Sequence, residues 1–133
     1  MTLPAKGPWE DFGPLRDRAR DAVAAIARAG LPARLVDQPG TEGPAAGVNA
    51  WLERADDGGA DLFFVWEPDP ELHAASRRAV EALDLGSPDL RFASEVTVAM
   101  RGALRAILSA AGFAAVDPPD ISGAQVLIRL PRV

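Results

Sequence analysis

The sequence predicts an α+β domain with a mostly antiparallel sheet of about five strands and three helices, in the order α-β-β-β-α-α-β-β. Three stretches repeat their apolar residues at helical spacing, which indicates helices that each bury one side. Two runs rich in β-branched and aromatic residues flank Asp57-Gly58, and Asp-Gly is a strong signal for a β-hairpin. We expect one domain over residues 13–133, preceded by an extended or disordered segment, residues 1–12.

The helices are expected over residues 14–29, 70–85 and 88–111. Proline stands at the favoured first position of each, and Asp69 and Ser87 precede two of these prolines as N-caps. Gly86 and Gly112 are the predicted stops of the second and third helices. The buried side of the second helix is expected to hold Leu72, Ala75, Ala79, Val80 and Leu83. The third helix has a broader apolar stripe, which is typical of a helix with two neighbours.

The strands are expected over residues 33–37, on both sides of the turn between residues 48 and 66, and over residues 113–116 and 124–130. Residues 38–47 are rich in glycine and proline, which predicts a loop. A two-residue turn at Asp57-Gly58 would place Arg54 opposite Asp61. That register makes both faces of the hairpin apolar, whereas a sheet with one solvated face alternates between apolar and polar residues.

The same register gathers an aromatic group on one face of the hairpin. We take this group as the candidate binding surface, because large rings with a polar rim are typical of protein interfaces. It consists of Trp51, Phe64, Trp66, Asn49 and Glu53. If all three helices cover the other face, this face needs a cover, which would be a second copy, another protein or a ligand. Helices on both faces would remove the argument, and core packing of these tryptophans is the alternative interpretation.

The composition excludes several classes of function. The chain has no cysteine and one histidine, which excludes disulfides, thiolate metal sites and multi-histidine metal centres, so we expect no cofactor and no metal. The formal net charge of −5 argues against nucleic acid as a partner. Without a secretory signal or an apolar run long enough for a membrane span, we expect a cytoplasmic protein. Thirteen of the fourteen basic residues are arginine, which suggests a bacterial source with a GC-rich genome.

No set of residues predicts a catalytic centre. Asp69 and Arg77 lie four residues on either side of His73, but this histidine is expected on the outer side of its helix, as a solvated residue. Glu95 is the one acid beside a buried stripe, where we expect an arginine partner rather than chemistry. Arg101 and Arg105 lie one helical turn apart and are possible contacts for an anion, although a solvated helix face explains them as well.

No motif identifies a family. The element order resembles that of the small acidic dimeric chaperones of bacterial secretion systems, and this chain has one additional long helix. The resemblance rests on topology, and it implies a homodimer that binds another protein.

Our first hypothesis is therefore a non-enzymatic protein-binding module: an adaptor, a chaperone or an immunity-type partner. It is expected to form a homodimer and to present the aromatic sheet face. The acidic balance would favour a basic protein partner by electrostatic steering. The alternative is a small-molecule binder or a carboxylate-dependent enzyme, with a pocket between the sheet and the third helix. Trp51, Trp66 and Glu53 would line that pocket, and Arg101 would reach an anionic group. A third hypothesis is a subunit that only completes a larger assembly.

Overall fold

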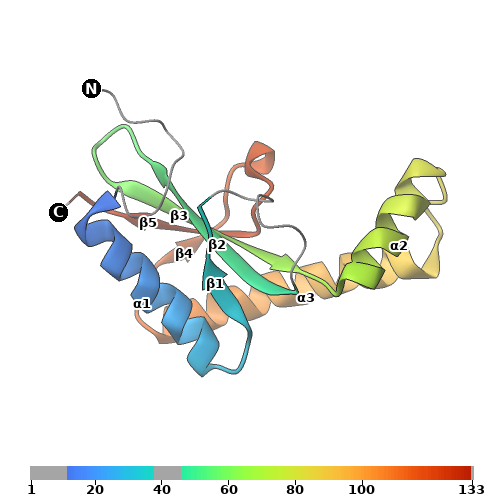
Figure 1. Ribbon diagram of the computed structural model, residues 1–133, viewed down its shortest axis with the longest axis horizontal. Helices are drawn as coiled ribbons and strands as arrows, with labels where there is room; N and C mark the ends of the chain where they lie inside the picture. Colours follow the sequence, from blue (N-terminus) through green and yellow to red (C-terminus); the bar gives the residue numbers. More distant parts are fainter. Residues whose placement is uncertain (1–11, 38–45, 133) are drawn as a thin grey trace.

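A five-stranded sheet in the order β1-β2-β3-β5-β4 forms the centre of the computed structural model, which describes residues 12–37 and 46–132 (Figure 1). The α+β class and the predicted order of elements are confirmed. The helices are α1 (Pro14–Arg28), α2 (Pro70–Glu81) and α3 (Pro88–Ala110). The strands are β1 (Ala33–Leu35), β2 (Gly47–Arg54), β3 (Ala60–Glu67), β4 (Ala115–Val116) and β5 (Val126–Leu130), with a 3₁₀ turn over Asp120–Ser122 before β5.

The sheet is mixed, because β1 pairs with β2 in parallel while the other neighbours are antiparallel. Parallel neighbours cannot be joined by a tight turn, and eleven residues separate β1 from β2 in the sequence. The sequence predicted a mostly antiparallel sheet and made no prediction for the direction of its first strand.

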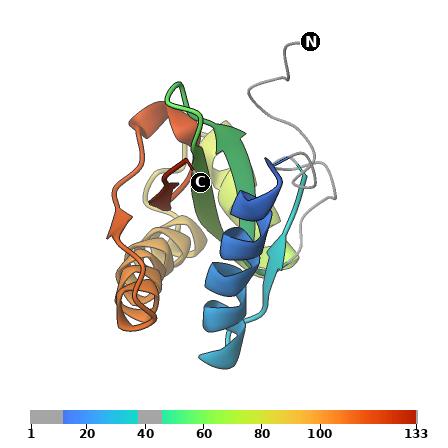
Figure 2. The same ribbon diagram turned by 90° about the vertical axis from the view of Figure 1, so that its left-hand side faces the viewer.

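Helix α1 and the second half of α3 cover one face of the sheet (Figure 2). The buried residues of α1 recur at helical spacing and are Leu15, Ala19, Ala22 and Ile26. Leu104 and Leu108 of α3 are fully buried against the same face. Phe12, which we had assigned to the N-terminal segment, is 6% exposed in this main core. Residues 1–11 of that segment lie outside the described residues.

The first half of α3 extends beyond the sheet together with α2 (Figure 1). We call α2, the turn after it and the first half of α3, residues 70–100, the helical arm. The arm begins as the sequence predicts: the Asp69 side chain accepts hydrogen bonds from the backbone N–H groups of Glu71 and Leu72, and Ser87 caps α3. Within α2, Ala79 is the one residue that is buried. Helix α2 therefore packs against α3 on one side and faces solvent on the others.

The end of α2 differs from the prediction. The helix ends at Glu81, and not near Gly86, because the backbone of Leu83 adopts a left-handed conformation with φ of 56°. The N–H of Asp84 donates to the carbonyl oxygen of Ala79, and the N–H of Leu83 donates to that of Val80. These two hydrogen bonds form a Schellman motif, whose left-handed position is usually glycine. Here it is leucine.

The hairpin register that the sequence predicted is wrong by one residue. The strands pair Glu53 with Asp61 and Trp51 with Phe63, whereas the two-residue turn predicted Arg54 opposite Asp61. The turn has three residues, because the N–H of Gly58 donates to the carbonyl oxygen of Ala55, and Gly58 follows in a left-handed conformation, with φ of 86°. A slip of one residue moves every side chain of one strand to the other face.

The geometry of the hairpin turn also explains why residue 59 is a glycine. The side chain of Asp57 accepts a hydrogen bond of 2.9 Å from the N–H of Gly59. A Cβ atom at Gly59 would collide with the backbone carbonyl oxygen of Leu130 on the neighbouring strand. The turn can therefore lie against β5 only if this position carries no side chain.

None of the helices in the described ranges 12–37 and 46–132 has the length and the apolar character that crossing a bilayer requires.

We predict opposite effects for two glycine-to-alanine substitutions. Gly59→Ala should lower the free energy of unfolding by at least about 1 kcal/mol, because the methyl group forces the turn away from β5. Gly102→Ala lies within α3 with open space around it, and should raise the free energy of unfolding by about 0.5–1 kcal/mol. Urea unfolding of both variants measures the difference. Equal stability of the two variants would contradict the described contact between the turn and β5.

Candidate functional site

The predicted aromatic surface does not exist as one exposed face. Because of the register, Trp51 lies on one face of the sheet, and Phe64 and Trp66 lie on the other, in the main core or against it. Trp51 is 2% exposed and Phe64 is fully buried. The expectation of an open aromatic sheet face is therefore wrong for both residues. Trp66 is half-buried at the end of β3 and is the member of the group that still borders a cavity.

Trp51 belongs to a second, smaller core. Its ring stacks on that of Phe63 with 5.5 Å between the centroids, and Val36 and Leu127 complete this cluster. The indole N–H of Trp51 donates a hydrogen bond of 2.9 Å to Glu53. A tryptophan with its ring packed and its donor satisfied is typical of a structural residue. Both faces of the sheet are thus closed around their central residues.

Asn49 and Glu53 of the predicted rim also have partners within the chain. Asn49 is 9% exposed, and its side-chain oxygen accepts a hydrogen bond of 2.6 Å from Arg34 on β1. Glu53 accepts the indole N–H and pairs across the strands with Asp61. The hydrogen bond between Arg34 and Asn49 ties β2 to β1, and the hydrogen bond between Trp51 and Glu53 lies within β2, so both predicted rim residues have partners in the sheet.

The two arginines proposed as anion contacts have different surroundings. Arg105 forms an ion pair of 2.8 Å with Asp117, so its guanidinium has a partner within the chain. Arg101 is exposed on α3. A joint anion site at the two residues would need Arg105 to exchange its partner.

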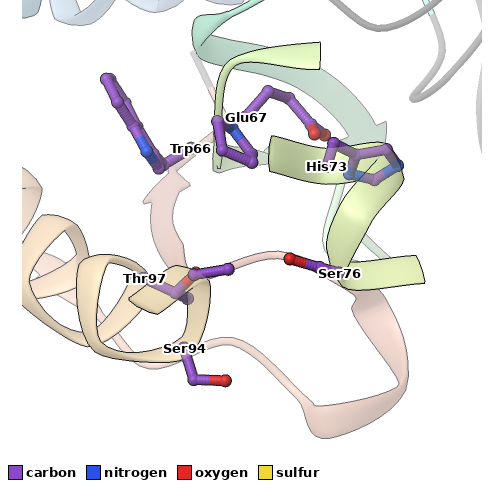
Figure 3. Close-up of a pocket in the computed structure, with 8 residues that line it drawn as sticks. Trp66, Glu67, His73, Ser76, Ser94 and Thr97 are labelled. Carbon is purple, nitrogen blue, oxygen red and sulfur yellow. The ribbon is translucent and has the colours of Figure 1, made fainter. Parts of the chain in front are cut away.

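A pocket of about 370 Å³ lies where the arm joins the sheet (Figure 3). It is close to the position of the pocket in our alternative hypothesis, between the sheet and the third helix, with α2 as an additional wall. Its lining comprises Trp66, Glu67, Pro68, His73, Ser76, Ala93, Ser94 and Thr97. Of the residues predicted for it, Trp66 is present, whereas Trp51, Glu53 and Arg101 are absent from the lining. The lining includes no arginine or lysine, so the pocket does not provide the expected contact for an anionic group.

Trp66 is fixed at this pocket by Gln125, whose side-chain amide accepts the backbone N–H of Trp66 and donates to its carbonyl oxygen. The indole nitrogen of Trp66 and the hydroxyl group of Ser76 are both buried without a hydrogen-bond partner. Because neither atom is accessible, neither can bind a ligand in this pocket without a movement of the arm. Buried polar groups without partners are costly, by about 1–3 kcal/mol each.

His73, at the rim of the pocket, is exposed, as the sequence predicted. Within the described ranges no cluster of histidine, aspartate or glutamate side chains has the arrangement that a metal ion would need. The polar side chains of the pocket are thus one carboxylate, one imidazole and three hydroxyl groups, on Glu67, His73, Ser76, Ser94 and Thr97.

Four of the six exposed large apolar side chains in the described ranges lie elsewhere, at the far end of the arm (Figure 1); the other two are Val98 on α3, 59% exposed, and Val116 on β4, 42% exposed. Leu83 is 81% exposed, Leu85 is 72%, Phe92 is 57% and Val80 is 50%. We call these four residues the arm surface. They come from the last turn of α2, the connection and the first turns of α3, so they share one end of the helical arm. Val80 and Leu83 were expected on the buried side of α2, and this expectation is wrong, because among residues 12–37 and 46–132 no third element covers that side.

Leu83 is unusual in its backbone as well as its exposure. A left-handed conformation costs a residue with a Cβ atom about 1–2 kcal/mol, and glycine or asparagine would avoid this cost. A leucine that is also solvent-exposed adds nothing to the packing of the monomer. Glycine at this position would therefore avoid the backbone cost without the loss of a buried side chain.

Comparison of the chain with protein-family models, with curated proteins and with solved structures finds no match. The functional interpretation accordingly depends on the geometry of the arm, the pocket and the sheet.

We predict that Asp61→Asn changes the pH dependence of stability. Partial burial raises the pKa of Asp61; Arg129 opposes this effect, and Asp57 and Glu53 add to it. The folded state therefore holds the proton more tightly than the unfolded state, and ionisation of Asp61 lowers stability as the pH rises through the folded pKa. The variant should be more stable than the wild type near pH 7, and this advantage should vanish below the ordinary aspartate pKa of about 3.9.

Thermal unfolding between pH 3 and pH 8 measures this difference. Asp117→Asn is the matched control, because it removes an exposed carboxylate that pairs with Arg105 and should bring no gain at neutral pH. If Asp61→Asn lowers the melting temperature at pH 7, the ion pair with Arg129 outweighs the burial, and our account of this carboxylate is wrong.

Proposed function

We propose that this chain is a non-enzymatic protein-binding module that contacts its partner through the arm surface, Val80, Leu83, Leu85 and Phe92. The function class is the one the sequence suggests, an adaptor, a chaperone or an immunity-type partner. The contact surface that we now propose is the arm surface, in place of the aromatic sheet face that the sequence predicted. The expected cytoplasmic location and bacterial source stay predictions.

One observation supports the proposal most strongly: Leu83 combines a left-handed backbone with 81% exposure. Burying such a side chain in an interface would contribute about 1.5–3 kcal/mol, which is enough to offset the backbone cost. Leu85 and Phe92 extend the apolar area on the same end of the arm. Exposed apolar groups of this kind, surrounded by charged residues, are typical of protein–protein contact sites.

The arm is also shaped for contact. It extends away from the sheet, so a partner can reach it without meeting the rest of the molecule (Figure 1). Its two helices leave their apolar sides only partly covered, and a helix pair gains most from one or two further helices that complete a bundle.

Site-specific photo-crosslinking in cells tests the proposal. We expect a benzophenone amino acid in place of Leu85 to give discrete protein adducts, and the same group in place of Val116 to give none. Val116 is the matched control, because it is 42% exposed on β4 and far from the arm. Adducts at position 85 should decrease when Phe92→Ser is added to the same chain. Absence of adducts at position 85, or equal adducts at both positions, would reject the arm as a contact surface.

A further inference from the structure

We infer that the partner of the arm is a second copy of this chain, and that two arms pair around a two-fold axis to form a four-helix bundle. This inference rests on the proposed function and specifies its partner.

The charge around the arm surface supports a second copy. Between residues 77 and 92 the exposed charges are three arginines and three acids: Arg77, Arg78, Arg91, Glu81, Asp84 and Asp89. Arg77 and Glu81 already lie 3.9 Å apart on one turn of α2. A surface with equal numbers of both signs can pair with itself, because an acid of one copy can meet an arginine of the other. A strongly basic partner would find no net attraction there.

The net charge of the chain explains why a contact between two copies would lie at the arm surface. The formal net charge is −5, so two copies repel one another over most of their surfaces. The end of the arm is locally neutral and lies far from the sheet (Figure 1), so pairing there brings the smallest amount of like charge together. The position of the apolar residues and the position of the neutral region therefore coincide.

The packing of the arm also supports a symmetric pair of arms. In α2 only Ala79 is buried, and Leu83, Leu85 and Phe92 are left exposed by the part of the chain that the structure describes. A symmetric pair of two-helix arms supplies each with two further helices, and the same patch serves both copies.

Light scattering with sedimentation equilibrium tests the inference on the purified chain. We expect a mass twice that of the 14.0 kDa chain at high micromolar concentration, with dissociation on dilution. Leu83→Gly should raise the dissociation constant at least about tenfold, since the lost leucine contact exceeds 1.4 kcal/mol. The same substitution relieves the left-handed backbone, so the monomer should remain folded by far-UV circular dichroism. The double variant Leu85→Ser with Phe92→Ser should also be monomeric.

Val116→Ser is the matched control and should leave the dissociation constant unchanged. A mass of one chain at every concentration would overturn the inference, as would a dissociation constant that Leu83→Gly does not change.

The photo-crosslinking experiment separates failure of this inference from failure of the proposed function. An adduct at position 85 with twice the mass of the chain supports a second copy. An adduct of another mass, together with a monomer in light scattering, rejects the second copy while the arm stays a protein-binding surface. Absence of any adduct rejects both.

Discussion

Helix α3 is longer than the sheet layer that it covers, and this mismatch determines the shape of the molecule. Its 23 residues span about 35 Å, and only the second half contributes fully buried residues, Leu104 and Leu108, to the main core. The first half must pack against something else. Within the chain that partner is α2, which leaves a two-helix arm with apolar side chains at its free end. The pocket at the base of the arm and the exposed leucines at its tip both follow from this arrangement.

The sheet, in contrast, is complete in itself. One face packs under α1 and α3, and the other holds the cluster around Trp51 and Phe63. Indole and amide donors at these positions bond to Glu53 and to residues of neighbouring strands. The aromatic residues that first suggested recognition thus stabilise the domain. The exposed leucines, Leu83 and Leu85, lie instead on the arm.

Much of the fold could be predicted because its signals are local. Asp69 and Ser87 cap helices with their own side chains, so the residues themselves mark where α2 and α3 begin. The hairpin was found for the same reason. Its register was not, since Asp57-Gly58 is compatible with a two-residue and a three-residue turn, and the choice depends on how Gly59 meets the backbone of Leu130. That contact joins residues far apart in the sequence.

The candidate site could be predicted only in part. Helical periodicity shows that one side of α2 is apolar, but it does not show whether anything covers that side, so Val80 and Leu83 were placed in a core that does not reach them. Gly86 was the natural stop for the helix by its residue type, and the left-handed leucine three residues earlier has no sequence signal. A pocket between the sheet and the third helix was foreseen together with Trp66, because both depend on the order of elements.

Hydrogen exchange of the arm at two protein concentrations tests the central claim most directly, because it reports whether the arm is complete in the single chain. Our account predicts that amides in residues 70–100 exchange quickly at low concentration and become protected at high concentration, while those of β2, β3 and β5 keep the same protection. Arm amides that are equally protected in dilute and in concentrated solution would contradict it, since the arm would then need no second surface to hold its structure.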